Sequence, residues 1–368
     1  MKAIRNLTLF FFILLGTSCH VARFFYFNVA DMRDYKKFPQ RPLTKAENPF
    51  VFVENSLDEN LYKIKFPKMQ EKEQNIQNWD MLLEETKSFS FLIIKNDSIL
   101  FERYYSGDDR IYPSFSVAKS YLSALIGIAI DEGIIQSVNE PITNYLDFFE
   151  NKGFDKITIE HLLNMKSGID FKESYFNPFG DIAKYYYGRN LKKYVRSVKI
   201  KEKPGQNYEY ISVNTLLLGM IIEEASGKKL YEYLDEKLWK PLGMEFEATM
   251  NVDSEKHDMA KSYCCINARS RDFAKFGRLF LNKGNWNGKQ IISEEWIKKS
   301  IEIEYTDDAY SKYHYQWRIR KNGSYYAQGI LGQFIYVNPK QNIIIVRNGK
   351  KKGINYWPSI FDYIAKNI

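Results

Sequence analysis

The chain has 368 residues, which is enough for one large domain with an insertion or for two structural units. Its composition of 45% hydrophobic and 27% charged residues, with 20 Gly and 11 Pro, excludes a disordered, collagen-like or coiled-coil protein. The net charge of +8 is spread over mixed acidic and basic segments, and the longest basic run is Lys350 to Lys352. We therefore expect a solvated mixed surface and no nucleic-acid partner.

The N-terminus has the pattern of an export signal. Lys2 and Arg5 precede an apolar run at 7–15, which is too short to span a bilayer as a mature helix. Three small residues then lead into Cys19, so residues 1–18 form a predicted signal peptide with an end similar to a bacterial lipobox. Cleavage there would leave Cys19 as a lipid anchor in a membrane, facing the periplasm or the cell exterior. Ordinary secretory cleavage is the alternative, because the nearest leucine stands four residues before the cysteine instead of three.

Residues 19–85 show no sustained periodicity and are predicted to form an N-terminal arm before a domain at 86–368. The domain opens with two segments rich in Phe, Ile, Leu and Tyr, at 89–95 and 98–105. They flank the turn-forming residues Asn96-Asp97-Ser98, so they predict a β-hairpin.

Helical patterns follow the hairpin. Residues 117–131 are apolar over a wide face and stop near Gly133, which predicts a buried helix. The region 135–310 is predicted to be mostly helical, with patterns at 158–165, 213–226, 229–238, 270–282 and 293–301.

Strand patterns return after Tyr313 and are joined by a strong Asn322-Gly323 turn. A last helix is predicted at 355–367. We therefore expect an α/β fold of the α+β type. An antiparallel sheet from 86–115 and 311–368 would be flanked by helices and interrupted by a mostly α-helical domain.

The sequence gives little support for metal or cofactor chemistry. The four histidines form no helical pair, and His161 fits a satisfied helix residue better than a ligand. Cys264 and Cys265 are adjacent, a spacing that rarely allows a mutual bond, so we expect two packing residues and no disulfide. The Gly-x-Ser-x-Gly elbow of many serine hydrolases is absent.

One nucleophile motif remains. Ser116 and Lys119 lie one turn apart at the start of the predicted buried helix, so the amine can reach the hydroxyl. The lysine can act as a base if burial and a neighbouring cationic or phenolic group lower its pKa. The helix N-terminus would favour the oxyanion of acyl transfer. The spacing alone is weak, because Ser226 and Lys229 repeat it across a helix boundary.

Four blocks extend the motif. They are PSFSVAKSYLSALIGIAIDEG, ITIEHLLNMKSGID, PGQNYEYISVNTLLLGMIIEEASGK and NARSRDFAKFGRLFLNKGNW, in that order. Together they resemble the class C β-lactamase-like serine hydrolases over about residues 85–350, and most of all the nylon-oligomer (aminohexanoate-oligomer) hydrolases and related esterases. The resemblance implies the β-lactamase and penicillin-binding-protein fold, with the active site between sheet and helical domain.

The resemblance assigns roles to single residues. Ser116 would be the acylated nucleophile and Lys119 its base. Tyr210 would be the third member, because Tyr210, Ser212 and Gly219 keep the family spacing of Tyr-x-Ser to Leu-Leu-Gly. A tyrosine beside a lysine ammonium would have its phenolate favoured and could relay the proton. Tyr208 is the nearby competitor.

The segment Gln328-Gly329-Ile330 stands where the family has Lys-Thr-Gly or His-x-Gly. Ile330 would give the second oxyanion N–H beside that of Ser116. Gln328 and Gly329 would contact substrate. Neutral Gln328 replaces the cation that holds the carboxylate of β-lactams or peptide termini, and Ser212 replaces an Asn, so both point away from β-lactam recognition.

The loop SGIDFKESYFNP is also expected to border the active site. Tyr175 is expected to line the leaving-group side of the cleft. Asp170 and Glu173 in the same loop fit a solvated acidic loop, although they could also favour an amine-bearing substrate.

We therefore expect a serine hydrolase that cleaves a carboxylic ester or small linear amide through acyl-Ser116, with no cofactor. One alternative is a β-lactamase or a penicillin-binding D-amino-acid peptidase acting on cell-wall peptides. Another is a non-catalytic surface lipoprotein that uses the fold as a binding module.

Overall fold

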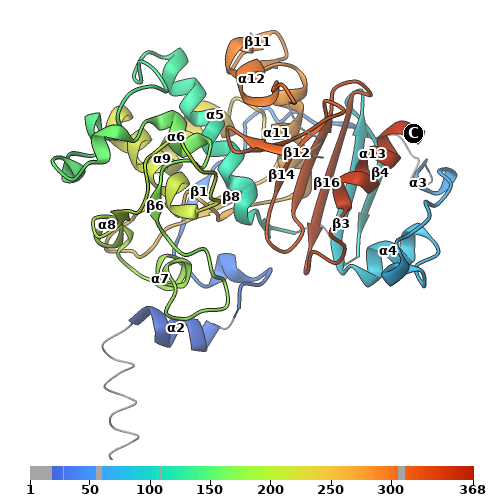
Figure 1. Ribbon diagram of the computed structural model, residues 1–368. Coiled ribbons are helices and arrows are strands. Elements are labelled where there is room, and N and C mark those ends of the chain that lie inside the picture. Colours follow the sequence, from blue (N-terminus) through green and yellow to red (C-terminus); the bar gives the residue numbers. More distant parts are fainter. Residues whose placement is uncertain (1–18, 28, 55–59, 106, 108–109, 306–310) are drawn as a thin grey trace, which may run out of the picture.

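The computed structural model describes residues 19–27, 29–54, 60–105, 107, 110–305 and 311–368 (Figure 1). The predicted signal peptide at 1–18 lies outside these residues, and Cys19 begins the first described helix, α2 (Cys19–Phe27). In the described ranges we find no helix that is both long and apolar enough to cross a membrane.

The main sheet has eight strands in the described part of the chain, in the order β12-β13-β14-β15-β16-β3-β4-β2. All neighbours are antiparallel except β2 and β4, which are parallel. The strands are β2 (Val53–Glu54), β3 (Ser88–Lys95), β4 (Ser98–Tyr104), β12 (Ser311–His314), β13 (Trp317–Arg320), β14 (Tyr325–Gln328), β15 (Phe334–Asn338) and β16 (Ile343–Gly349).

The predicted hairpin is confirmed. Lys95 pairs with Ser98, and Asn96 and Asp97 between them have φ of 51° and 59°. A two-residue turn with both φ positive matches the twist of the strands, and Asn and Asp tolerate this conformation best after Gly.

Helices cover both faces of the main sheet (Figure 1). On one face α11 (Ser270–Leu281) contacts β3, β15 and β16, and on the other α13 (Trp357–Asn367) and α4 (Trp79–Glu85) pack against β15 and β3. The helical region lies beside the sheet. Its helices are α5 (Ala118–Asp131), α6 (Ile159–Leu163), α7 (Asp181–Tyr187), α8 (Leu191–Val195), α9 (Ser212–Ser226), α10 (Leu230–Leu234) and α12 (Glu294–Ile301).

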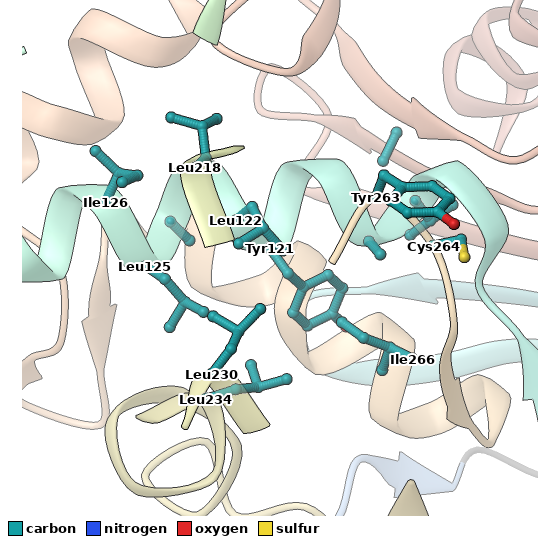
Figure 2. Packing of buried hydrophobic residues seen from close by; sticks show 14 of the residues in the cluster. Tyr121, Leu122, Leu125, Ile126, Leu218, Leu230, Leu234, Tyr263, Cys264 and Ile266 are labelled. Atoms are coloured by element: carbon teal, nitrogen blue, oxygen red, sulfur yellow. The ribbon is translucent and has the colours of Figure 1, made fainter. Parts of the chain in front are cut away.

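Helix α5 is buried, as its pattern predicted, and it packs against α9. Figure 2 shows Tyr121, Leu122 and Leu125 of α5 beside Leu218 of α9 and Leu230 of α10. All of these side chains are at most 1% exposed. Burial on this scale fixes the position of the α5 N-terminus.

The segment at 19–85 is not a separate irregular arm. Strand β1 (Gln40–Leu43) joins a second sheet, ordered β1-β8-β9-β5, and Leu43 is fully buried. Helix α2 packs on α7, and a short helix, α3 (Asn60–Lys63), lies against β4. The buried apolar residues of this segment stand at irregular intervals, and its elements pack against parts of the chain that are distant in sequence, so the sequence shows no sustained period. The remaining strands are β5 (Tyr112–Pro113), β6 (Ile169–Asp170), β7 (Lys199–Ile200), β8 (Ala248–Asn251), β9 (Ile266–Ala268), β10 (Asn285–Trp286) and β11 (Lys289–Gln290).

Candidate active site

The chain turns sharply just before α5. A 3₁₀ turn at Phe115–Val117 precedes the helix, and Phe115 has a φ of 44°, a left-handed conformation that costs energy for a residue with a Cβ. Ser114 holds this turn against β9, donating its N–H to the Ile266 carbonyl at 2.8 Å and accepting the Ile266 N–H on Oγ at 3.1 Å. Phe115 and Val117 are buried, whereas Ser116 between them is partly exposed.

The structure brings Lys119 and Ser116 together. The Lys119 Nζ lies 3.2 Å from Ser116 Oγ, 3.1 Å from Ser212 Oγ and 2.9 Å from the Tyr263 carbonyl oxygen. Lys119 is 1% exposed, and it makes no salt bridge within the described residues. Burial lowers its pKa to about 8, although the charge of Glu173 acts against this and that of Arg318 adds to it. The predicted fall in pKa is confirmed, so a neutral amine is accessible near Ser116.

Tyr210 also lies beside the serine, two residues before the start of α9. Its ring centre is 5.1 Å from Lys119 Nζ, and its hydroxyl is hydrogen-bonded to Ser116. Burial raises the pKa of Tyr210 to about 12, and the hydrogen bond with Ser116 and the charge of Arg318 only partly oppose the rise. The prediction of a favoured phenolate is therefore wrong, because desolvation outweighs the nearby cations. Tyr210 is a phenol that can pass on a proton. The competitor Tyr208 is 46% exposed and packs on Tyr313.

Glu173 contacts two of the predicted site residues, Ser212 and Tyr175, and the sequence did not indicate these contacts. Its carboxylate accepts the Ser212 N–H at 2.9 Å, the Ser212 hydroxyl at 2.6 Å and the Tyr175 hydroxyl at 2.8 Å. The expectation of a solvated acidic loop is wrong for Glu173, because the loop folds over the N-terminus of α9. The expectation of a solvated acid is correct for Asp170, which is exposed. Ser212 therefore bridges Glu173 and Lys119.

The turn after β14 offers one backbone donor. The Gly329 N–H donates to the Gln333 carbonyl at 2.8 Å and the Leu331 N–H to Gln333 Oε1 at 3.1 Å. Between them, the Ile330 N–H has no acceptor among the described residues. A Cβ on Gly329 would stand 2.7 Å from the Ser114 carbonyl oxygen, so this turn lies against the chain that leads to Ser116. The arrangement suits an oxyanion hole.

A pocket of about 230 Å³ opens beside Ser116. Four predicted residues line it, namely Ser116, Tyr175, Ser212 and Ile330. Gln328, Gly329, Lys119 and Tyr210 are not part of its wall, and Gln328 instead ends β14 opposite Phe334. The other lining residues are mainly apolar and were not predicted: Val29, Ala30, Phe115, Phe176, Ile182, Ala183, Tyr186, Tyr187, Tyr263, Cys264 and Leu331.

Cys264 and Cys265 form a disulfide, so the prediction of two unbonded packing residues is wrong. Both are buried, and Cys265 has a φ of 77°, a backbone conformation in which the two adjacent side chains meet. Cys264 lines the pocket next to Tyr263, whose carbonyl accepts a hydrogen bond from Lys119. Figure 2 shows the side chains of Tyr263 and Cys264 close together.

The second Ser-x-x-Lys pair forms no site. Ser226 Oγ donates to the Ile222 carbonyl within α9, while Lys229 Nζ donates to the Asp258 carbonyl. His161 has a structural role as well, since its Nδ1 accepts the Thr158 N–H in the N-terminal cap of α6. Among the described residues, no group of three His, Cys, Asp or Glu could hold a metal ion.

Comparison with known proteins places this geometry in a family. The Beta-lactamase family model matches residues 82–355, which is most of the chain. The chain belongs to the Beta-lactamase family. It is therefore a hydrolase-family protein with the predicted fold, and its Ser116 turn, α5 and β14 lie inside the matched region.

Several of its relatives are named as hydrolases, and solved structures share its fold. The chain is 26% identical over 302 residues to a 6-aminohexanoate-dimer hydrolase of Paenarthrobacter ureafaciens, covering 75% of this chain and 74% of the relative. Its fold matches a Bacillus anthracis structure assigned as a 6-aminohexanoate-dimer hydrolase, with a TM-score of 0.75, 24% identity and 89% of each chain covered. A family VIII carboxylesterase matches with a TM-score of 0.59, 16% identity and 76% and 92% of the two chains covered. The predicted fold class is thereby confirmed.

Proposed function

We propose that this β-lactamase-family hydrolase cleaves a carboxylic ester or a small linear amide through an acyl-Ser116 intermediate. One observation carries the proposal above all. The Ser116 hydroxyl lies within hydrogen-bond distance of a buried lysine amine whose pKa is lowered to about 8. An amine in that state is a competent base for a serine nucleophile.

The reaction divides into two displacements. Neutral Lys119 takes the Ser116 proton as Oγ attacks the carbonyl carbon of the substrate. The resulting oxyanion accepts hydrogen bonds from the backbone N–H groups of Ile330 and Ser116. Tyr210 then donates a proton to the departing oxygen or nitrogen as its bond to the carbonyl carbon breaks. The Tyr210 phenolate left by this step takes a proton from water, and the hydroxide attacks the carbonyl carbon of the acyl-enzyme. The Lys119 ammonium returns its proton to Ser116 Oγ as the acid leaves, so that both groups regain their starting states.

The pocket supports a neutral acyl chain as the group transferred to Ser116, because its lining is mainly apolar. The relatives support an amide or an ester as the bond that is cleaved, since one is named a 6-aminohexanoate-dimer hydrolase and another a carboxylesterase. Gln328 carries no charge, so at that position it offers no cation for the carboxylate of a β-lactam or of a peptide terminus.

Export and anchoring belong to the same proposal. The N-terminal pattern supports cleavage after residue 18 and lipid attachment at Cys19, which would place the enzyme on a membrane at the periplasmic or outer surface. Cys19→Ser should release the cleaved protein from the membrane fraction of an expressing bacterium. Recovery of both forms in the same soluble fraction would contradict the anchor.

The test of the hydrolase proposal is the time course of p-nitrophenol release from p-nitrophenyl butyrate. We expect a burst that scales with enzyme concentration and is lost in Ser116→Ala. Ser123→Ala is the matched control, because Ser123 lies buried in α5, its hydroxyl has no hydrogen-bond partner among the described residues, and the variant should keep the burst. Equal rates for the native enzyme and Ser116→Ala would overturn the proposal and favour the non-catalytic binding module. A burst with penicillin but none with the ester would favour the β-lactam alternative.

A further inference from the structure

The rim of the pocket beside Ser116 is apolar and exposed. Val29 and Phe176 both line the pocket, although Val29 is 41% exposed and Phe176 is 80% exposed. Nine large hydrophobic residues are exposed in the described part of the chain, and five of them lie at 25–29 and 176–179, the two segments that form this rim. Single exposed apolar side chains are common on soluble proteins, whereas a group around a pocket indicates a surface that a partner covers.

Helix α2 turns two aromatic rings of this group outward. Its Phe24 and Phe27 pack against Tyr187 of α7, with ring centres 5.4 and 6.4 Å apart. Because a helix advances about 100° per residue, Phe25 and Tyr26 between them point away from α7, and they are 64% and 83% exposed. Figure 1 shows α2 beneath α7 at the outer end of the helical region.

Positive charge flanks these rings. A hollow beside α2 is lined by five Lys or Arg and by two acids, and the five include Arg23 of α2, Lys36 and Arg189. Residues 182–201, which hold most of α7 and all of α8, contain seven Lys or Arg and no Asp or Glu. Exposed aromatic rings beside basic side chains fit a bilayer with anionic phospholipids, since the rings enter at headgroup level and the cations meet the phosphates. A second copy of the chain fits less well, because a symmetric contact would bring the same positive charge to both sides.

The place of the proposed lipid agrees with a membrane at this surface. Cys19 is the first residue of α2. Tyr26 lies seven residues further along the same helix, which is about 10 Å at the usual helical rise. A lipid on Cys19 would therefore hold α2, and the pocket rim that follows it, at the bilayer.

We propose that a docking face consisting of Phe25, Tyr26, Val29, Phe176 and Phe179 lies on an anionic phospholipid bilayer and that the pocket takes its acyl chain from the lipid phase. The inference rests on the proposed function and narrows its substrate class to esters or amides with an acyl chain that dissolves in the bilayer. Such a chain would pass the exposed rim and reach Ser116 through apolar surroundings, without crossing water.

The test uses the exported, cleaved Cys19→Ser protein, which carries no lipid at residue 19, so membrane binding reports the docking face itself. Its sedimentation is measured with vesicles of phosphatidylglycerol and phosphatidylethanolamine and with neutral phosphatidylcholine vesicles. Turnover is measured with p-nitrophenyl decanoate dissolved in the anionic vesicles and with p-nitrophenyl butyrate in vesicle-free buffer. We expect binding to the anionic vesicles that exceeds binding to the neutral ones and weakens as salt is added.

The decisive variant is the triple change Phe25→Ser, Tyr26→Ser and Phe179→Ser. Because it removes three rings from the interface, we expect vesicle binding and decanoate turnover to fall by at least ~10-fold. Its circular dichroism spectrum and its kcat/KM for soluble butyrate should match those of the parent, since none of the three residues lines the pocket. The matched control is Val51→Ser with Val53→Ser, which removes exposed apolar side chains in and before the edge strand β2 and should change none of these quantities.

Three results would overturn the docking face. They are a parent protein that does not sediment with anionic vesicles, a triple variant that binds and hydrolyses as the parent does, and a parent dimer that the triple variant converts to monomer, which would mean that a second copy covers the face. If neither ester is hydrolysed faster by the parent than by its Ser116→Ala variant, the proposed function and the lipid substrate fall together. The sedimentation result then decides the docking face alone.

Discussion

The chemistry of the site depends on the surroundings of one lysine. Lys119 is buried among neutral acceptors, with a carboxylate and a guanidinium acting on it from a distance in opposite senses. Glu173 does not touch the lysine, but it holds Ser212, which does. We therefore regard Glu173 as a positioning residue that also sets the pH at which Lys119 becomes neutral.

This view predicts a pH profile. In the proposed mechanism the base is the neutral amine, so kcat/KM for p-nitrophenyl butyrate should rise with pH through about 8. Glu173→Gln removes a negative charge that raises the pKa of Lys119, so the rising limb should move to lower pH. Asp170→Asn, an exposed acid of the same loop, should leave the limb where it is. A limb that stays in place or moves to higher pH in Glu173→Gln would contradict this role.

The candidate site lies where the N-terminus of α5 meets the end of β14. The contact is close, since a Cβ on Gly329 would come within 2.6 Å of Gln333 Oε1 and 2.7 Å of the Ser114 carbonyl oxygen. No side chain fits between the two elements there. Ile330, the next residue of this turn, lines the same pocket as Ser116.

Gly329→Ala should therefore displace the β14 turn and the donor that it carries. We expect kcat to fall by ~10²-fold, as for loss of one oxyanion donor, while the protein stays folded. Steady-state kinetics and a thermal melt followed by circular dichroism measure the two effects. An unchanged kcat in a folded Gly329→Ala enzyme would show that this turn does not stabilise the oxyanion.

At the scale of the whole molecule, the N-terminal segment ties the parts together. It supplies β1 to the second sheet and β2 to the main sheet, and its residues Val29 and Ala30 line the pocket. The segment is therefore part of the enzyme body rather than a spacer.

Leu43→Ala tests this integration, because Leu43 is fully buried in β1. We expect the free energy of unfolding in urea to fall by ~2–5 kcal/mol, the usual cost of emptying a leucine site in a core. Val51→Ala, at a position 55% exposed in the same segment, should change it by about 0.5 kcal/mol or less. Equal small effects of both changes would mean that the segment is only loosely attached.

Much of this fold was predictable because the signals are local. The hairpin turn, the helix at 117–131 and the strands after Tyr313 each follow from a pattern of neighbouring residues. The Ser116–Lys119 pair is likewise the geometry of one helical turn.

The rest depends on contacts between distant residues. Lys119 binds a carbonyl 144 positions away at Tyr263, and Arg318 reaches Tyr210 from another element. Glu173 looked like any acid in a polar loop, because nothing in its neighbourhood shows that the loop covers α9. Cys264 and Cys265 form their bond in a left-handed backbone conformation that no residue pattern announces.

The proposed function requires Ser116 to carry the acyl group. The most direct test is the intact mass of enzyme quenched in acid within the burst with p-nitrophenyl butyrate, followed by peptide mapping. We predict the added mass of one butyryl group, located on the peptide that contains Ser116 and absent from Ser116→Ala. A butyryl group on another residue, or turnover with no acylated enzyme at any quench time, would contradict the proposed acyl-Ser116 intermediate.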